Sequence, residues 1–159
     1  MPTWHRSGRS PKEESPGLAI VTCMDARLDR CGLFDLWARP AHVIRNAGGR
    51  VTADVLRSLA VSCAMQTDRV VIMHHTGCAM AEHSEEDLHC LLPDGADLEV
   101  DFLTIDNPSE SLLRDVRAVK ASTLIPQTVK VSGMIYDLCS RTAREIEDDR
   151  VALHPLTDV

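Results

Sequence analysis

Two short apolar runs constrain the fold of this chain more than any other feature. Residues 18–22 read Leu-Ala-Ile-Val-Thr and residues 70–73 read Val-Val-Ile-Met, with no charge in either run. A run that is apolar at every position is typical of a strand buried on both faces, as in a parallel sheet. Parallel neighbours are joined by crossover connections, which are usually helical. The two runs therefore indicate an α/β domain.

The rest of the chain alternates between strand and helix patterns, as an α/β domain requires. Strands are expected at 18–22, 42–45, 68–73 and 129–138, with a short return strand near 144–146. Helices are expected at 28–38, 53–66, 85–92 and from 108 onward, with Thr52, Ser84 and Asn107 as N-caps. We predict a mostly parallel central β-sheet flanked by helices, with an antiparallel edge strand. It forms a single domain over residues 17–159, after a flexible N-terminal arm at residues 1–16.

Composition excludes several classes of protein. The 159 residues are 44% hydrophobic and 26% charged, as in an ordinary globular domain. A net charge of −7 argues against binding to a phosphate backbone, and five aromatic residues are too few for a base-stacking platform. No apolar run approaches the roughly 20 residues that span a bilayer, and no signal-peptide core is seen. We expect a cytoplasmic protein that binds neither nucleic acid nor membrane.

A cysteine motif follows each of the two apolar runs. The first is Cys23-Met24-Asp25-Ala26-Arg27, and the second is His75-Thr76-Gly77-Cys78. Two thiolates and an imidazole suit a zinc site that keeps its fourth position open for chemistry. The motifs lie far apart in the sequence, but functional groups collect at the carboxyl ends of strands in an open α/β sheet. Two strand ends can therefore close on one metal ion.

Asp25 and Arg27 add groups that a purely structural zinc site does not need. If the chain stays extended past Cys23, residues 23, 25 and 27 point to one side. Arg27 could then hold Asp25 by a bidentate salt bridge, and Asp25 could accept a hydrogen bond from zinc-bound hydroxide. Alternatively, Asp25 could become the fourth zinc ligand and switch the site off. A merely structural ion pair is the third interpretation.

A glycine loop follows the strand at 42–45. Gly48 and Gly49 would allow unusual φ values and a close backbone approach beside the metal. Asn46 could offer its amide to a small polar ligand. These three residues are candidate substrate-binding residues.

Together, these motifs resemble the β-class carbonic anhydrases in order and spacing. The resemblance covers about residues 18–138 and is carried by Cys23–Arg27, Val43–Gly49, His74–Cys78 and Val131–Asp137. It implies one Zn²⁺ per subunit on Cys23, His75 and Cys78, with Asp25 and Arg27 as the catalytic dyad. The implied reaction is the reversible hydration of CO2 to bicarbonate and a proton by zinc-bound hydroxide. The implied assembly is a homodimer or a higher homo-oligomer.

The resemblance also bears on neighbouring residues. His74 and His75 alternate in direction on a strand, and the family spacing favours His75 as the ligand. Arg45 matches a position that helps to hold bicarbonate at a regulatory site in some members, but its partners there have no match, so no role is assigned. The remaining cysteines lack ligand-like neighbours and are interpreted as core or surface thiols: Cys31, Cys63, Cys90 and Cys139.

Two other functions stay open at this stage. A related zinc hydrolase could use the same ligands on CS2 or COS, because entrance loops rather than ligands decide between these substrates. A non-catalytic zinc or bicarbonate-responsive binding protein would have its zinc closed by Asp25 or by a fourth thiolate.

Overall fold

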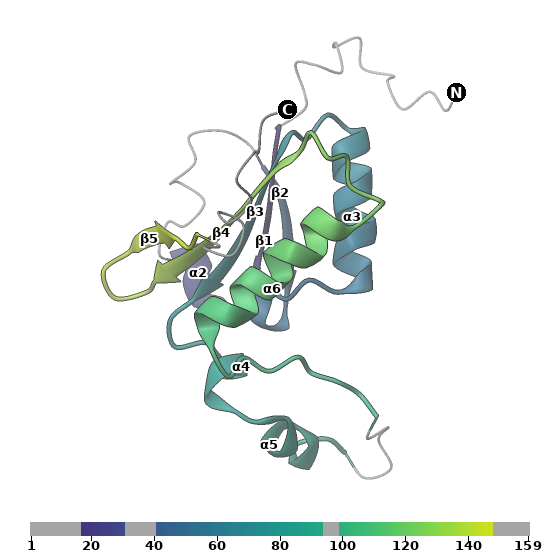
Figure 1. Cartoon of the computed structure of the whole chain (residues 1–159). Helices are drawn as coiled ribbons and strands as arrows, with labels where there is room; N and C mark the ends of the chain where they lie inside the picture. Colours follow the sequence, from purple (N-terminus) through teal and green to yellow (C-terminus); the bar gives the residue numbers. More distant parts are fainter. Residues whose placement is uncertain (1–16, 31–40, 94–98, 148–159) are drawn as a thin grey trace, which may run out of the picture.

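The computed structural model describes residues 17–30, 41–93 and 99–147, which build a five-stranded sheet in the order β2-β1-β3-β4-β5 (Figure 1). The strands are β1 (Leu18–Cys23), β2 (His42–Asn46), β3 (Arg69–His75), β4 (Lys130–Asp137) and β5 (Thr142–Glu145). The helical elements are α2 (Arg27–Arg30), the 3-10 turn η2 (Ala47–Gly49), α3 (Ala53–Ala64), α4 (Ala79–Glu82), α5 (Glu85–Cys90) and α6 (Pro108–Ala121).

The strand directions confirm the predicted fold class. The β1–β2, β1–β3 and β3–β4 pairs are parallel, and β5 pairs antiparallel with β4 at one edge. The predicted arm at residues 1–16 and most of the predicted helix at 28–38 lie outside the described residues. No helix within residues 17–30, 41–93 and 99–147 has both the length and the apolar composition needed to cross a membrane.

The two apolar runs form the centre of the sheet, as their composition predicted. Every residue of β1 is buried, and so is β3 from Val70 to His75. The structure extends β3 two residues beyond its predicted end at Met73, because pairing with β4 continues as far as His75 opposite Tyr136. This extension places His75 at the carboxyl end of the strand.

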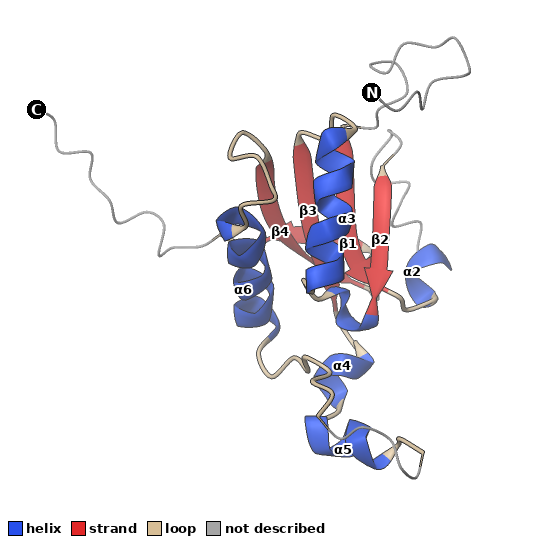
Figure 2. Ribbon diagram, turned by 90° about the vertical axis from the view of Figure 1, so that its right-hand side faces the viewer, coloured by secondary structure: helices blue, strands red, loops and turns tan. Residues whose placement is uncertain are grey.

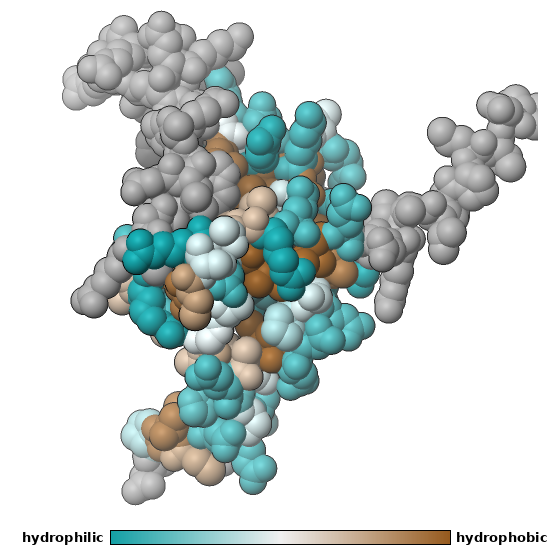
Figure 3. Space-filling model, turned by 90° about the vertical axis from the view of Figure 1, so that its left-hand side faces the viewer, coloured by the Kyte–Doolittle hydropathy of each residue, from teal (hydrophilic) through white to brown (hydrophobic). Residues whose placement is uncertain are grey.

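Helices α3 and α6 cover the same face of the sheet (Figure 2). Right-handed crossovers explain this arrangement, because β2 to β3 and β3 to β4 cross the sheet in one direction. The crossover from β1 to β2 runs the other way, and Leu28 of α2 accordingly packs on the opposite face with Ile20 and Val71. On that face, apolar side chains show between polar ones (Figure 3).

Three predicted N-caps are confirmed. The Thr52 and Asn107 side chains accept hydrogen bonds from helical backbone amides, and Ser84 forms a capping box with Asp87. Helix α3 ends at Ala64, earlier than the predicted residue 66, because Gln66 adopts a φ of 72° and cannot continue the helix. Helices α4 and α5 project away from the sheet (Figure 1).

The strand order creates a switch point between β1 and β3. After β1 the chain adds β2 on one side, and it then returns to add β3 on the other side. The carboxyl ends of β1 and β3 therefore lie side by side without a crossover between them, which is where open α/β sheets bind ligands. The two cysteine motifs begin at these two strand ends.

Candidate metal centre

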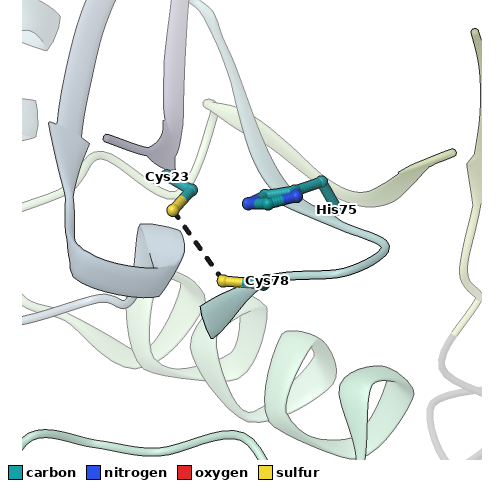
Figure 4. Close-up of side chains that lie close together, drawn as sticks. All are labelled: Cys23, His75 and Cys78. Atoms are coloured by element: carbon teal, nitrogen blue, oxygen red, sulfur yellow. Dashed lines mark hydrogen bonds between the residues drawn. The ribbon is translucent and has the colours of Figure 1, made fainter. Parts of the chain in front are cut away.

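Cys23, His75 and Cys78 converge at the switch point (Figure 4). Cys23 ends β1, His75 ends β3, and Cys78 directly precedes α4. All three residues are buried, and their ligand atoms lie within 4.8 Å of one another. The structure thus brings together the three residues that the sequence nominated as metal ligands.

The donor set fits a zinc ion. The Sγ atoms of Cys23 and Cys78 are 3.8 Å apart, the separation of about 3.8 Å that two zinc–sulfur bonds of about 2.3 Å give at a tetrahedral angle. His75 Nδ1 lies 2.9 Å from the carbonyl oxygen of Thr76, which fixes the proton on Nδ1. Nε2 is buried and has no hydrogen-bond partner among the described residues. Its lone pair is therefore available to a metal.

The two sulfurs differ in acidity. A hydrogen bond from Cys78 lowers the pKa of Cys23 to about 4, against the opposing effect of burial. The backbone amides of Asp25 and Gly48 also lower it. The same sulfur–sulfur contact, together with burial, raises the pKa of Cys78. The sulfur–sulfur hydrogen bond favours loss of a proton from the pair, and a divalent cation would displace whatever proton remains, since zinc binds thiolates rather than thiols.

The Asp25–Arg27 salt bridge is confirmed. The prediction that the backbone stays extended from Cys23 to Arg27 is wrong. Arg27 Nε donates to both carboxylate oxygens of Asp25 (3.0 and 3.1 Å), and Nη2 donates to Oδ2 at 2.6 Å. The chain turns after Asp25 instead, because the amides of Arg27 and Leu28 bond back to the Asp25 side chain and carbonyl. Such self-capping turns are typical of Asp. The guanidinium holds the pKa of Asp25 at about 2.

The dyad lies directly beside the ligand cluster. Asp25 Oδ2 is 3.9 Å from His75 Nε2, and its side chain is 16% exposed. Arg27 is 57% exposed and reaches across to the second motif, where Nη2 donates to the carbonyl of Gly77 at 2.6 Å. The dyad therefore links both cysteine motifs and forms the solvent-facing side of the site.

The glycine loop approaches β1 closely, as expected. Gly48 and Gly49 have φ values of 73° and 68°. A Cβ on Gly49 would lie 2.8 Å from the carbonyl carbon of Thr22. The Asn46 Nδ2 donates to the carbonyl of Arg50 at 2.8 Å, so part of this amide stabilises the loop itself. The substrate-binding role of Asn46, Gly48 and Gly49 stays a prediction.

A buried ion-pair network behind the site was not anticipated. Arg50 Nε donates to Asp115 Oδ2 at 2.7 Å, and His74 Nε2 lies 3.2 Å from the same oxygen. Burial raises the pKa of Asp115, but hydrogen bonds from His74 and Arg50 outweigh it and lower the pKa overall. His74 thus packs on the face away from the ligands, as predicted. The sequence signal was an acidic residue within the apolar stripe of α6, beside Leu112 and Val116.

The other cysteines take no part in this cluster. Cys63 is half-buried, whereas Cys90 and Cys139 are exposed, and Cys31 lies outside the described residues. Within the part of the chain that the structure describes, the Cys23–His75–Cys78 group is the only set of three metal-ligating side chains. A fourth thiolate that would close the zinc site is therefore not found among the described residues.

The fold and the Cys–His–Cys site define a class of protein, and comparison with known proteins identifies it. The carbonic anhydrase family model matches residues 18–95. β-Carbonic anhydrase 1 of Mycobacterium tuberculosis is 31% identical over an alignment of 142 positions, and the match covers 87% of each chain. The crystal structure of carbonic anhydrase from Streptococcus mutans is 37% identical, with a TM-score of 0.74, and the match covers 84% of this chain and 82% of that one. The chain belongs to the β-class carbonic anhydrase family.

The same comparisons include relatives that act on another substrate. The carbon disulfide hydrolase of Acidianus sp. is 28% identical over 155 residues, covering 80% of this chain and 76% of that protein. Membership of the family therefore indicates an enzyme and leaves the substrate to be argued from the site.

Proposed function

We propose that this protein is a zinc-dependent carbonic anhydrase that catalyses the reversible hydration of CO2 to bicarbonate and a proton. One observation carries the proposal. The sulfurs of Cys23 and Cys78 and the lone pair of His75 Nε2 converge beside an Asp25 carboxylate that Arg27 holds. A purely structural zinc site needs the Cys23, His75 and Cys78 ligands but does not need the Asp25–Arg27 pair.

Each residue has a distinct role in this proposal. Cys23, His75 and Cys78 would hold one Zn²⁺ per subunit, which supplies Lewis acidity and lowers the pKa of a water molecule. Asp25 is ionised at every pH well above 2, so its carboxylate is an acceptor only. It accepts a hydrogen bond from a water or substrate hydroxyl beside the ligand cluster and so orients an oxygen lone pair toward CO2.

Arg27 keeps the Asp25 carboxylate available for this task. With its Nε and Nη2 donors on Asp25, the guanidinium opposes rotation of the carboxylate into the ligand cluster. The alternative in which Asp25 closes the site as a fourth ligand requires these hydrogen bonds to break. We propose Asn46, Gly48 and Gly49 as the wall against which a small polar product rests.

The proposal is tested by metal analysis combined with pH-indicator stopped-flow measurement of CO2 hydration. We expect one zinc per chain and a rate that the chelated, zinc-free protein loses and added zinc restores. A zinc-loaded protein no faster than free zinc ions from neutral to alkaline pH would refute the enzyme. It would favour the non-catalytic zinc or bicarbonate-responsive alternative, with Asp25 closing the site.

CS2 or COS is the second candidate substrate, and the similarity to the carbon disulfide hydrolase of Acidianus sp. favours CS2 of the two. Both substrates are linear like CO2, so the same ligand cluster and dyad suffice for their hydrolysis. A sulfide-release assay on the same zinc-loaded preparation discriminates. Sulfide release faster than CO2 hydration would assign the protein to the hydrolase branch.

We also propose a homodimer or higher homo-oligomer located in the cytoplasm. Structures described as two tetrameric β-carbonic anhydrases from Sordaria macrospora share the fold, with a TM-score of 0.63. Light scattering coupled to size-exclusion chromatography gives the assembly state directly. A monomer at micromolar concentration would refute this part of the proposal.

A further inference from the structure

Arg45 reaches from β2 across to the segment that carries Cys23, Asp25 and Arg27. Its Nε donates to the carbonyl of Cys23 at 3.0 Å, and its Nη2 donates to the carbonyl of Asp25 at 2.7 Å. Its Nη1 pairs with the Asp29 carboxylate at 2.6 Å. One guanidinium thus bonds the beginning, the middle and the far side of the turn that follows β1.

The position of this turn matters because the sheet no longer holds it. Regular pairing between β1 and β2 ends at Cys23 opposite Asn46, and a single further hydrogen bond joins Met24 N to the Asn46 carbonyl at 2.8 Å. Beyond it, the Asp25 carbonyl accepts a bond from Leu28 N at 3.1 Å, and the buried Leu28 side chain anchors α2. Arg45 bridges the stretch between these two anchors.

We propose that Arg45 is a positioning residue, which fixes the backbone of Cys23 and Asp25 and thereby the geometry of the ligand cluster and the dyad. Asp29, whose side chain is 56% exposed, pairs with the Arg45 guanidinium from the solvent side and so orients it. Each of the three nitrogen atoms of the Arg45 guanidinium group donates to an acceptor in the turn or in α2. These bonds place the group on the backbone that carries Cys23 and Asp25.

The planar fork of arginine is essential to this role. A lysine ammonium keeps the charge but is a single point on a flexible stem, so it cannot bond three acceptors spread over the turn. Arg45→Lys is accordingly the sharp test, and Asp29→Asn is the milder one, since it removes the charge but keeps an acceptor. Arg57→Lys is the matched control, because Arg57 pairs with Asp54 on the exposed surface of α3.

The first measurement is hydrogen exchange at the amides of Met24 and Leu28 in the zinc-loaded protein. Arg45→Lys is expected to speed exchange at both amides by about 10-fold or more, since local opening sets their protection. Amides in the middle of β3, such as that of Ile72, should stay as in the wild type, and so should every amide in Arg57→Lys. Wild-type exchange at Met24 and Leu28 in Arg45→Lys would overturn the proposal. A uniform increase across the sheet would also overturn it, because that result signals a general loss of stability.

The second measurement is CO2 hydration, and this arm rests on the proposed function. With zinc content unchanged, kcat/KM should fall about 10- to 100-fold in Arg45→Lys, the effect of a displacement of about 1 Å at a reacting group. In Asp29→Asn, kcat/KM should fall about 2- to 5-fold, the effect of losing one exposed ion pair. If the wild type does not hydrate CO2, the proposed function fails. Hydrogen exchange at Met24 and Leu28 still tests whether Arg45 positions the turn. If Arg45→Lys does not fold, both measurements are made on Asp29→Asn. Hydrogen exchange and kcat/KM equal to those of the wild type in that variant would refute the positioning role of Arg45.

Discussion

The Arg27 guanidinium holds Asp25 and at the same time bonds the carbonyl of Gly77. Nη2 contributes to both interactions, at 2.6 Å each. The salt-bridged pair therefore contacts both cysteine motifs, so the orientation of the carboxylate depends on the same backbone segments that carry Cys23 and Cys78.

The first prediction concerns the acidity of Asp25. Arg27 holds its pKa at about 2, below the usual value of about 3.9. Because the folded-state pKa is depressed, the pair stabilises the fold above about pH 4, and this contribution is lost as the pH falls toward 2. Carbon-13 NMR titration of the Asp25 carboxyl in the zinc-free protein should show the low midpoint, and Arg27→Gln should raise it. Arg57→Gln should leave it unchanged. An equal midpoint in Arg27→Gln and the wild type would contradict the pairing.

The second prediction concerns the three proposed metal ligands. Replacement of Cys23 or Cys78 by Ser, or of His75 by Ala, should reduce zinc content from one per chain to a small fraction, since each removes one of three protein donors. The same Cys→Ser change at Cys63, Cys90 or Cys139 should leave zinc content intact, because these thiols lie outside the cluster. Elemental analysis after dialysis against a weak chelator checks this. Full zinc retention in Cys23→Ser would show that the cluster is misassigned.

The third prediction concerns the buried pair of Arg50 and Asp115, whose side chains are 4% and 5% exposed. Asp115→Asn leaves the Arg50 charge buried without a counter-charge, which should lower the free energy of unfolding by about 3–5 kcal/mol. Denaturant unfolding measures the loss. Asp54→Asn, which breaks the exposed pair with Arg57, serves as the control and should change little. Similar losses of unfolding free energy in Asp115→Asn and Asp54→Asn would contradict this prediction, because the buried pair would then stabilise the fold no more than the exposed one.

The fourth prediction separates two glycines with similar backbone angles. Gly49→Ala and Gly77→Ala both place a Cβ at positive φ, which costs about 1–2 kcal/mol. Only at Gly49 does the Cβ meet backbone, 2.8 Å from Thr22, so overpacking adds about 1–3 kcal/mol there. At Gly77 the nearest atoms are 3.8 Å away. Unfolding free energies and zinc affinity should both fall further in Gly49→Ala, and equal losses in the two variants would refute the close approach.

Sequence patterns predicted the parts of this protein that depend on local composition. The unbroken apolar runs indicated β1 and β3, and the capping residues Thr52, Ser84 and Asn107 marked three helix starts. The order and spacing of the two cysteine motifs, together with their resemblance to the β-class carbonic anhydrases, nominated Cys23, His75 and Cys78.

What the sequence did not reveal depends on contacts between distant side chains. Asp115 and Arg50 meet only once α6 has packed on the sheet, so neither residue signals the other. The turn after Asp25 was missed because the pattern does not show that the carboxylate bonds its own backbone. Arg45 received no role from the resemblance, because the partners of the family's bicarbonate site have no match here. The contacts it makes instead, with the carbonyls of Cys23 and Asp25, depend on how the chain turns after β1.

The central claim is that Asp25, held by Arg27, makes a zinc-binding cluster catalytic. Stopped-flow CO2 hydration by the zinc-loaded wild type and the zinc-loaded Asp25→Asn variant, compared at equal zinc content, tests it most directly. We predict a wild type far faster than free zinc ions and a variant reduced about 100- to 1,000-fold in kcat/KM, the usual cost of losing one preorganised polar group at a reacting centre. Equal rates in the two proteins, with zinc bound to both, would contradict the account.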